Sequence, residues 1–171
     1  KSAKAYRPAE YRDIVILLRS VKNRANQVME IFRQAGIPAY ADLDTGYFSA
    51  VEIRLMVALL QVLDNPKQDI PLAAVLRAPW FGLTPEDLVA IRLAAPRGNF
   101  HDAMLVASRA DSQLGERLRD INATLDTWRT MARRLSLSKL IPYLYRETGF
   151  YHYAATMPKG EQRQANLRGL H

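Results

Sequence analysis

Asp13-Ile14-Val15-Ile16-Leu17-Leu18-Arg19-Ser20 is the stretch from which the rest of the chain is interpreted. Its aliphatic run, Ile14 to Leu18, is mostly β-branched and contains neither glycine nor proline. Such a short unbroken apolar run is typical of a strand buried on both faces of a parallel sheet, and less typical of an amphipathic helix. Arg19 stands at the carboxyl end of this run, where ligands of open α/β sheets usually bind. The stretch therefore predicts a strand that carries a cation toward a ligand, although an arginine can also end a strand simply by reaching solvent.

The residues after this strand predict a helix and a second extended segment. A polar turn over 20–23 leads into a helix from about 24 to 34, which ends at Ala35-Gly36. Ile37-Pro38-Ala39-Tyr40 then reads as an extended segment, and the acidic, glycine-containing residues 42–46 read as a turn. Residues 13–42 are thus expected to form a strand–helix–strand unit of an α/β fold.

The composition indicates a globular, basic chain. Of its 171 residues 49% are hydrophobic, and the net charge is +7 with an isoelectric point near 9.9. The charge favours an acidic partner such as nucleic acid. The absence of cysteine excludes disulfides, thiolate metal sites and a cysteine nucleophile, and it fits the cytoplasm. The apolar runs are too short to span a membrane and no signal peptide is evident, so we expect no membrane association. The missing initiator methionine suggests processing, or a fragment of a longer protein.

The remaining sequence is helical by its apolar spacing. Ser49 is expected to cap a helix that reaches about Leu63, with Glu52 completing a capping box. A helix near Asp69 should end before Pro79, and Thr84 should cap the next. Further helices are expected at about 84–94, 99–108, 111–134, 136–147 with a kink at Pro142, 149–156 and 161–170. The change in composition near Pro79 divides the chain into 1–79 and 80–171, and the expected fold class is α/β, strongly helix-rich.

Most catalytic motifs are missing. There is no GxxxxGK[ST] phosphate loop, and the three histidines are scattered without metal-ligand spacing. Asp42 and Asp44 lie in a turn, where acidic residues are expected for backbone reasons. We therefore predict no metal site, and no complete catalytic cycle within these residues alone.

Basic residues form several clusters instead. Arg129 and Arg133, at i and i+4 after Trp128, share one helix face. Phosphate contacts there would bind DNA without sequence preference and weaken with salt, whereas the alternative is a set of solvated helix faces. The clusters are Arg12, Arg19, Lys22 and Arg24; Arg129, Arg133 and Arg134; and Lys159, Arg163 and Arg168.

Several segments, in this order, resemble one family. Tyr11–Ser20 and Ala35–Tyr40 resemble motif IV and the following strand of UvrD/Rep-type superfamily 1 helicases. Gly46–Ile53 is similar to a segment of that family with a glycine, a nearby phenylalanine and a Glu-Ile pair, and Asp64-Asn65-Pro66 falls at its Asn-Pro stop. Ile70–Arg77 and Gly160–Leu170 are most similar to the helicase–nucleases of the AddAB type within it.

The resemblance implies a fold and residue roles. Residues 1–79 would be the first part of the RecA-like motor domain 2A, and 80–171 the helical part of the 2B insertion. The family's motif IV arginine contacts the ATP γ-phosphate, and the resemblance assigns that catalytic role to Arg19. A guanidinium at this place would stabilise the negative charge that grows on the phosphoryl group in the transition state. The family commonly has an adenine-stacking tyrosine just before this arginine; here the residue is Leu18, which lacks a π-face.

The resemblance also implies DNA contacts. Arg77-Ala78-Pro79 before Gly82-Leu83-Thr84 is similar to the segment leading into a DNA-contacting glycine turn, although the second glycine is missing. Gly82 and Thr84 would there offer backbone amides to a phosphate, with Lys22, Arg24, Arg129 and Arg133 as further DNA contacts. Trp80 and Phe81 are expected in the core.

The function implied is a fragment of an ATP-dependent DNA helicase/exonuclease subunit for double-strand-break repair and recombination. The parent would use ATP and Mg²⁺, with none bound by this fragment alone. It would act on single- and double-stranded DNA and would form a heterodimer with an AddB-like partner subunit. Two alternatives stay open: a stand-alone DNA-binding module without a motor, and a helical docking surface for the partner subunit.

Overall fold

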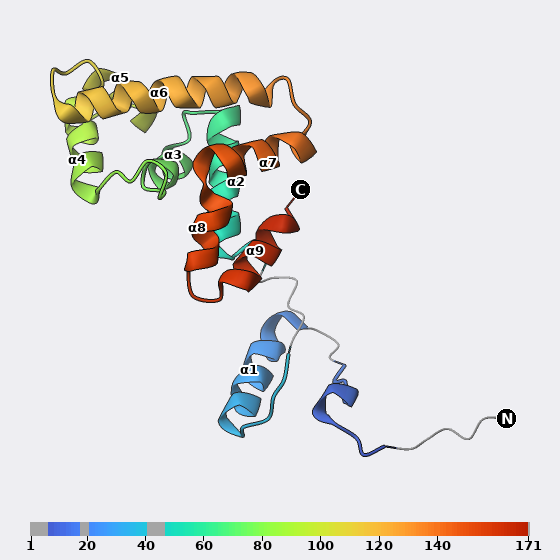
Figure 1. The fold of residues 1–171 in the computed structure, drawn as a ribbon. Coiled ribbons are helices and arrows are strands. Elements are labelled where there is room, and N and C mark those ends of the chain that lie inside the picture. The colour runs from blue at the N-terminus through green and yellow to red at the C-terminus, as the bar shows by residue number, and fades with distance from the viewer. Residues whose placement is uncertain (1–6, 18–20, 41–46, 171) are drawn as a thin grey trace. The chain divides into compact units, whose positions relative to one another are not determined.

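The computed structural model describes residues 7–17, 21–40 and 47–170, and these fall into two compact units, 1–48 and 49–171 (Figure 1). The first unit contains a short 3-10 helix, η1 (Tyr11–Asp13), and the helix α1 (Val21–Gln34). The predicted helix after the polar turn is confirmed, although it begins at Val21 instead of near residue 24. It ends at Gln34, two residues before Gly36, whose φ of 68° lies in the left-handed region that favours glycine.

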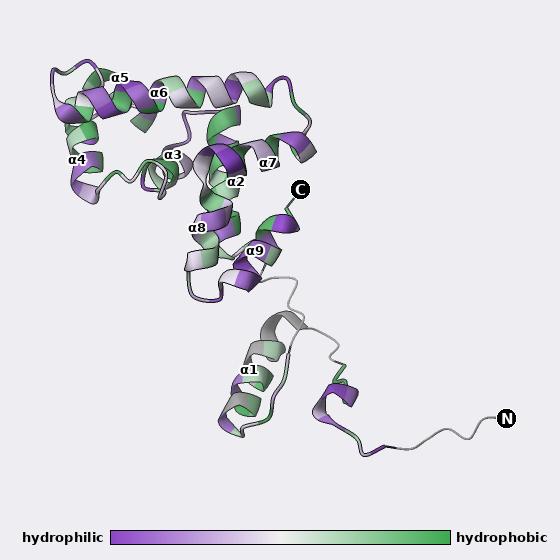
Figure 2. Cartoon of the chain, viewed as in Figure 1, coloured by the Kyte–Doolittle hydropathy of each residue, from purple (hydrophilic) through white to green (hydrophobic). Residues whose placement is uncertain are grey.

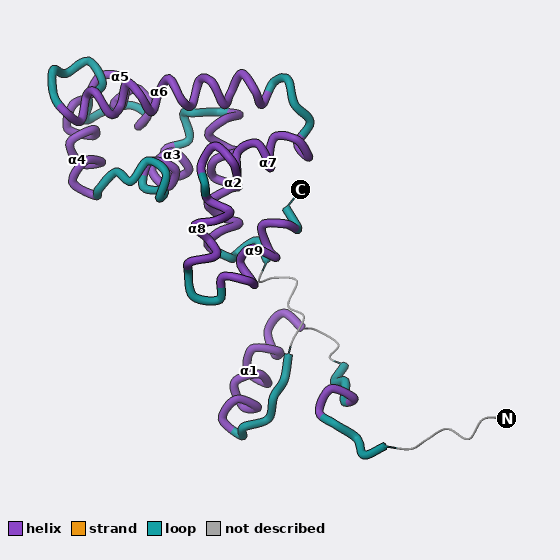
Figure 3. The backbone as a smooth tube through the Cα atoms, viewed as in Figure 1, coloured by secondary structure: helices purple, strands orange, loops and turns teal. Residues whose placement is uncertain are grey.

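The strand predicted from Ile14 onward is wrong for the residues that the structure describes. Ile14 to Leu17 have irregular backbone, and their side chains are between 54% and 90% exposed. Leu18, Arg19 and Ser20 lie outside the described residues. Ile37–Tyr40 is also irregular, and Figure 3 shows helices and loops but no strand in the described parts of the chain. An extended segment becomes a strand only when a neighbour completes its backbone hydrogen bonds, and no described segment does so here.

The described residues of the second unit form helices joined by turns and short loops, which confirms the helix-rich part of the predicted fold class. The contacts run α2 with α3, α6 and α9; α5 with α3, α4 and α6; and α7 with α6 and α8, while α8 packs on α9. Figure 1 shows α6 lying along one side of this unit, with α2, α8 and α9 together at another. The helices are α2 (Val51–Asp64), α3 (Asp69–Leu76), α4 (Pro85–Ala94), α5 (Phe100–Ala107), α6 (Gln113–Ala132), α7 (Leu137–Thr148), α8 (Phe150–Thr156) and α9 (Gly160–Arg168).

Helix caps agree with the sequence at one predicted position and disagree at another. Thr84 caps α4 as predicted, since its Oγ1 accepts from the Asp87 amide at 3.1 Å and the Asp87 carboxylate accepts from the Thr84 amide at 2.9 Å. The capping box predicted at Ser49 is wrong, because the residue before α2 is Ala50, which offers no side-chain cap. Glu52 points elsewhere: its side chain is buried.

The two aromatic residues that follow Pro79 pack against distant helices. Trp80 packs edge-on against Phe150 of α8 with ring centroids 5.2 Å apart, and Phe81 stacks on Trp128 of α6 at 5.7 Å. Both side chains are half-buried in these contacts, so the predicted core position of Trp80 and Phe81 holds only in part. Because α3 also packs on α5, residues on both sides of Pro79 belong to one compact unit. The assignment of 1–79 and 80–171 to two named subdomains stays a prediction.

Candidate nucleic-acid interface

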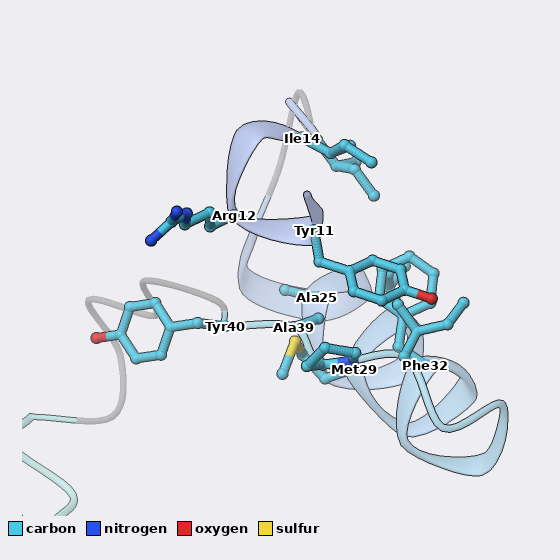
Figure 4. Close-up of a pocket in the computed structure, with 12 residues that line it drawn as sticks. Tyr11, Arg12, Ile14, Ala25, Met29, Phe32, Ala39 and Tyr40 are labelled. Carbon is cyan, nitrogen blue, oxygen red and sulfur yellow. The ribbon is translucent and has the colours of Figure 1, made fainter. Parts of the chain in front are cut away.

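The first unit contains an apolar hollow of about 800 Å³ (Figure 4). One wall is a face of α1, where Ala25, Met29 and Phe32 lie at helical spacing. Ile14 and Tyr11 close another side, and Figure 4 shows Arg12 and Tyr40 directed away from the apolar cluster. The remaining lining residues are Ile16, Val28, Ile37, Pro38 and Ala39. The hollow is thus bounded by the segments that the sequence predicts to be a strand, a helix and a second strand.

The residues predicted to contact nucleotide are not among those that the structure describes. Arg19 and Leu18 are outside the described residues, so their roles stay predictions. Lys22 and Arg24 belong to the first turns of α1, but their side chains are likewise outside what the structure describes. Arg12, from the same predicted cluster, forms an ion pair with Glu10 at 2.8 Å on the surface. Such an exposed pair contributes little to stability and does not remove the arginine from solvent.

The turn at Gly82 and Thr84 is arranged differently from a simple phosphate cradle. Gly82 has the left-handed φ of 61° that a tight turn requires, and its amide donates to Ala78 at 2.7 Å. The Leu83 amide donates to Leu76, and the Thr84 amide donates to the Asp87 carboxylate. The amides predicted to face a phosphate are therefore engaged within the protein, beside the carboxylate of Asp87. A contact of this turn with DNA stays a prediction, and the geometry adds no support to it.

Arg129 has a structural partner that the sequence did not indicate. Its Nε donates to the Leu63 carbonyl at 3.3 Å. Leu63 lies in the last turn of α2, where the final carbonyls of a helix have no partner within the helix. A guanidinium at this position also meets the negative end of the helix dipole. Arg129 therefore joins α6 to the end of α2, whatever else it contacts.

Arg133 lies one turn further along α6 and is free to act differently. It is the C-terminal capping residue of α6 and is exposed, as are Arg134 and Lys139. Among the described residues, no ion pair or side-chain hydrogen bond holds Arg133. These three cations follow one another around the α6–α7 junction, which appears as a hydrophilic segment in Figure 2. They form an exposed basic surface suited to phosphate contacts.

The last basic cluster has two members with internal partners. Arg163 donates to the carboxylate of Glu52 and to the Pro158 carbonyl at 3.0 Å. Arg168 donates to the Tyr151 hydroxyl at 2.7 Å. The sequence placed Glu52 in a capping box and did not pair it with Arg163, because the two lie 111 residues apart.

His101 is a buried polar group of unusual environment. Its Nδ1 is buried without a hydrogen-bond partner and lies 3.8 Å from the Asp102 carboxylate. Burial lowers the pKa of His101, an effect that Asp102 opposes and that the positive charges of Arg129 and Lys67 reinforce. Within the described ranges, no group of three or more acidic or histidine side chains is arranged to hold a metal ion. None of the described helices is long and apolar enough to cross a membrane.

Comparison with known proteins places these features in context. The UvrD-like helicase C-terminal domain matches residues 2–101. The chain is 52% identical over its whole length to an ATP-dependent helicase/nuclease subunit from Pelotomaculum thermopropionicum, of which it covers 14%. It is 55% identical over 97% of its length to the protein of that name from Heliobacterium modesticaldum, and 51% identical over 98% to that from Anoxybacillus flavithermus, covering 13% and 14% of them. The chain thus spans about a seventh of the curated relatives it matches.

Proposed function

The chain belongs to the family of UvrD-like helicase C-terminal domains, and on that premise we propose that it is a segment of an ATP-dependent DNA helicase–nuclease subunit. Similarity over the whole chain to proteins named as ATP-dependent helicase/nuclease subunits is the observation that carries this proposal. The parent protein would translocate on single-stranded DNA, unwind duplex ends and act in double-strand-break repair and recombination. The phosphate loop, the Mg²⁺ ligands and the nuclease site would lie outside this chain.

The first unit fits the start of a RecA-like domain 2A. Its hollow is apolar on the face of α1 and beside Ile14 and Ile16, and these isoleucines are more than half exposed. Burying such side chains is the main favourable contribution to folding, so we expect another layer of secondary structure to cover these isoleucines in the parent protein. Other strands of a motor-domain sheet would supply that layer and would turn residues 14–18 into the predicted strand. Residues 80–171 would then be the helical part of 2B.

Arg19 would act at the nucleotide. At the end of that strand its guanidinium would donate to the γ-phosphate and stabilise the charge that develops during phosphoryl transfer. Leu18 would pack against the base without stacking on it. Lys22 and Arg24, in the first turns of the following helix, would add positive charge near the bound DNA.

The helical part would contact DNA through the α6–α7 junction. Arg133 carries most of this proposal, because it is exposed and not held by a described partner. Arg129 would add charge beside it while remaining bound to α2. Gly82 and Thr84 would contribute less, since the Gly82, Leu83 and Thr84 amides are engaged internally.

A partner-docking role is favoured by one further surface. Val89 and Leu93, one turn apart on α4, are 58% and 70% exposed. Together they form a small exposed apolar patch on one face of α4, which contact with another protein would bury. An AddB-like partner subunit in a cytoplasmic heterodimer is the partner that we propose for it.

Two experiments test the proposal. Sequencing the coding frame on both sides should reveal a phosphate loop upstream, and stop codons close to both ends would refute a motor parent. In that parent, Arg19→Ala should reduce ATP hydrolysis about a thousandfold, as loss of an arginine finger does, while single-stranded DNA binding stays nearly unchanged. Arg97→Ala, at an exposed loop position, is the control. Normal hydrolysis by Arg19→Ala would remove Arg19 from the nucleotide site without affecting the family assignment.

A further inference from the structure

The carboxylate of Glu52 is buried and bound from both sides by one helix. Its side chain is 2% exposed. One carboxylate oxygen accepts from Nη1 of Arg163, and the other accepts from Nδ2 of Asn166 at 2.7 Å. Arg163 and Asn166 are three residues apart and so lie on the same face of α9. The first turn of α2 and the middle of α9 are therefore joined by a charge-assisted pair and an amide.

Further hydrogen bonds fix the orientation of the two α9 side chains that donate to Glu52. Gln162 donates to the Asn166 side-chain oxygen at 3.1 Å, which leaves the Asn166 amide hydrogens directed at Glu52. Nε of Arg163 donates to the Pro158 carbonyl, which fixes the orientation of the guanidinium. Burial alone would raise the pKa of Glu52, but the hydrogen bond from Asn166, a backbone hydrogen bond and the charge of Arg163 outweigh it and leave that pKa lowered. The cation of Arg163 and the amide of Asn166 thus favour the ionised form of Glu52 at its buried position.

Apolar contacts contribute unusually little to the position of α9. Leu167 is the only residue between 160 and 168 that is buried, and Figure 2 shows α9 mostly in the colours of hydrophilic residues. Several further contacts of α9 with other helices are polar: the Tyr145 hydroxyl donates to the Leu167 carbonyl at 2.7 Å, Gln164 donates to the Tyr151 carbonyl at 3.2 Å, and Arg168 donates to the Tyr151 hydroxyl at 2.7 Å. Other helices of this unit, such as α2 and α6, bury several apolar side chains each.

The chain makes a tight turn at Lys159–Gly160, where α9 begins. Lys159 has a left-handed φ of 60°, and a side-chain carbon on Gly160 would lie 2.1 Å from the Ala155 carbonyl oxygen of α8. Such close backbone contact holds this end of α9 against α8. The rest of the helix is held by the contacts to Glu52, Tyr145 and Tyr151.

We propose that Glu52, Arg163 and Asn166 form a polar latch that closes α9 onto α2 and releases it as one element. A buried carboxylate tolerates the loss of its cationic partner only when water replaces that partner. A state in which only one of the two contacts to Glu52 is broken is therefore disfavoured. When α9 separates from α2 by rotation at the Lys159–Gly160 turn, water hydrates Glu52. The helices α2 to α6 have their own apolar core and stay folded. The latch does not rest on the proposed helicase function, since it involves only contacts within this unit.

Hydrogen–deuterium exchange of the 171-residue chain tests the latch. Glu52→Gln should accelerate exchange of the amides at 163–168 at least tenfold, with amides of α4 to α6 unchanged. Glu86→Gln is the matched control, because Glu86 occupies the equivalent position in the first turn of α4 but is exposed. Asn166→Ala, which keeps the ion pair, should produce a smaller acceleration and serves if Glu52→Gln does not fold.

Two outcomes would overturn the proposal. Unchanged exchange in α9 would mean that the polar contacts do not hold it. Equal acceleration in all helices of the unit would mean that α9 unfolds only together with the core, so that no latch exists.

Discussion

Replacement of Arg129 by glutamine separates its structural contact from any contact with DNA. Arg129 reaches from α6 to the Leu63 carbonyl at the end of α2. Glutamine keeps part of the side-chain stem but cannot place a charged donor at that carbonyl. The perturbation therefore removes one interhelix hydrogen bond and one cation at a helix terminus.

The expected cost follows from the geometry. Hydrogen bonds with one charged partner contribute about 1.5–3 kcal/mol. The donor–acceptor distance of 3.3 Å and a side chain that is 28% exposed place this bond near the lower end. The ion pair with Asp126 at 3.9 Å adds little, because Asp126 is exposed. We expect the free energy of unfolding to fall by about 1–2 kcal/mol.

Urea unfolding followed by tryptophan fluorescence measures this change, since Trp128 is buried and adjacent to Arg129 and Trp80 packs in the same unit. With a urea dependence of about 2 kcal/mol per molar, the midpoint should fall by about 0.5–1 M. Arg133→Gln is the control and should shift the free energy of unfolding by less than about 0.5 kcal/mol. Equal stability of Arg129→Gln and the native chain would show that the contact with Leu63 contributes nothing.

Three further predictions follow from the same structure. Arg133→Gln should weaken binding of the chain to DNA and reduce the slope of log affinity against log salt by about 1, measured by fluorescence anisotropy; an unchanged slope would exclude Arg133 as a phosphate contact. Gly160→Ala should lower the free energy of unfolding by about 1–3 kcal/mol, because the added carbon meets the Ala155 backbone; a chemical-denaturation midpoint equal to that of the native chain would contradict this. His101, whose pKa is lowered chiefly by burial, binds a proton less readily when folded than when unfolded. Its contribution to stability is therefore present above its ordinary pKa of 6.5 and should be lost as the pH falls below that value. Thermal melts at several pH values measure this loss, which should be absent from the His101→Gln variant. If the melting temperatures of the variant and the native chain change with pH in parallel, His101 does not cause the loss.

The helical part of the chain was predictable because its signals are local. Thr84, Pro85 and Asp87 determine where α4 begins through contacts within four residues of one another, and the structure has that capping box. The helix boundaries near Pro66 and Gly98 likewise follow from turn residues. The cap at Ser49 failed because Glu52, which completes the same sequence pattern, is drawn into a contact with a helix more than a hundred residues away.

The candidate nucleic-acid interface was also predictable only in part. The sequence indicated which residues are cationic, but Arg129, Arg163 and Arg168 prove to have partners at Leu63, Glu52 and Tyr151. Arg133 keeps an exposed position, which no spacing rule distinguishes from that of Arg129 four residues earlier.

By itself the sequence determined the positions of the helices, the basic character of the surface and the family resemblance, because these depend on residue type and short-range spacing. Only the tertiary structure decided which polar groups are buried together and which aliphatic residues lack cover. The run from Ile14 to Leu17 has the composition of a buried strand, yet it is exposed in the described residues. A strand exists only with its neighbours, since its hydrogen bonds and its burial both come from other segments.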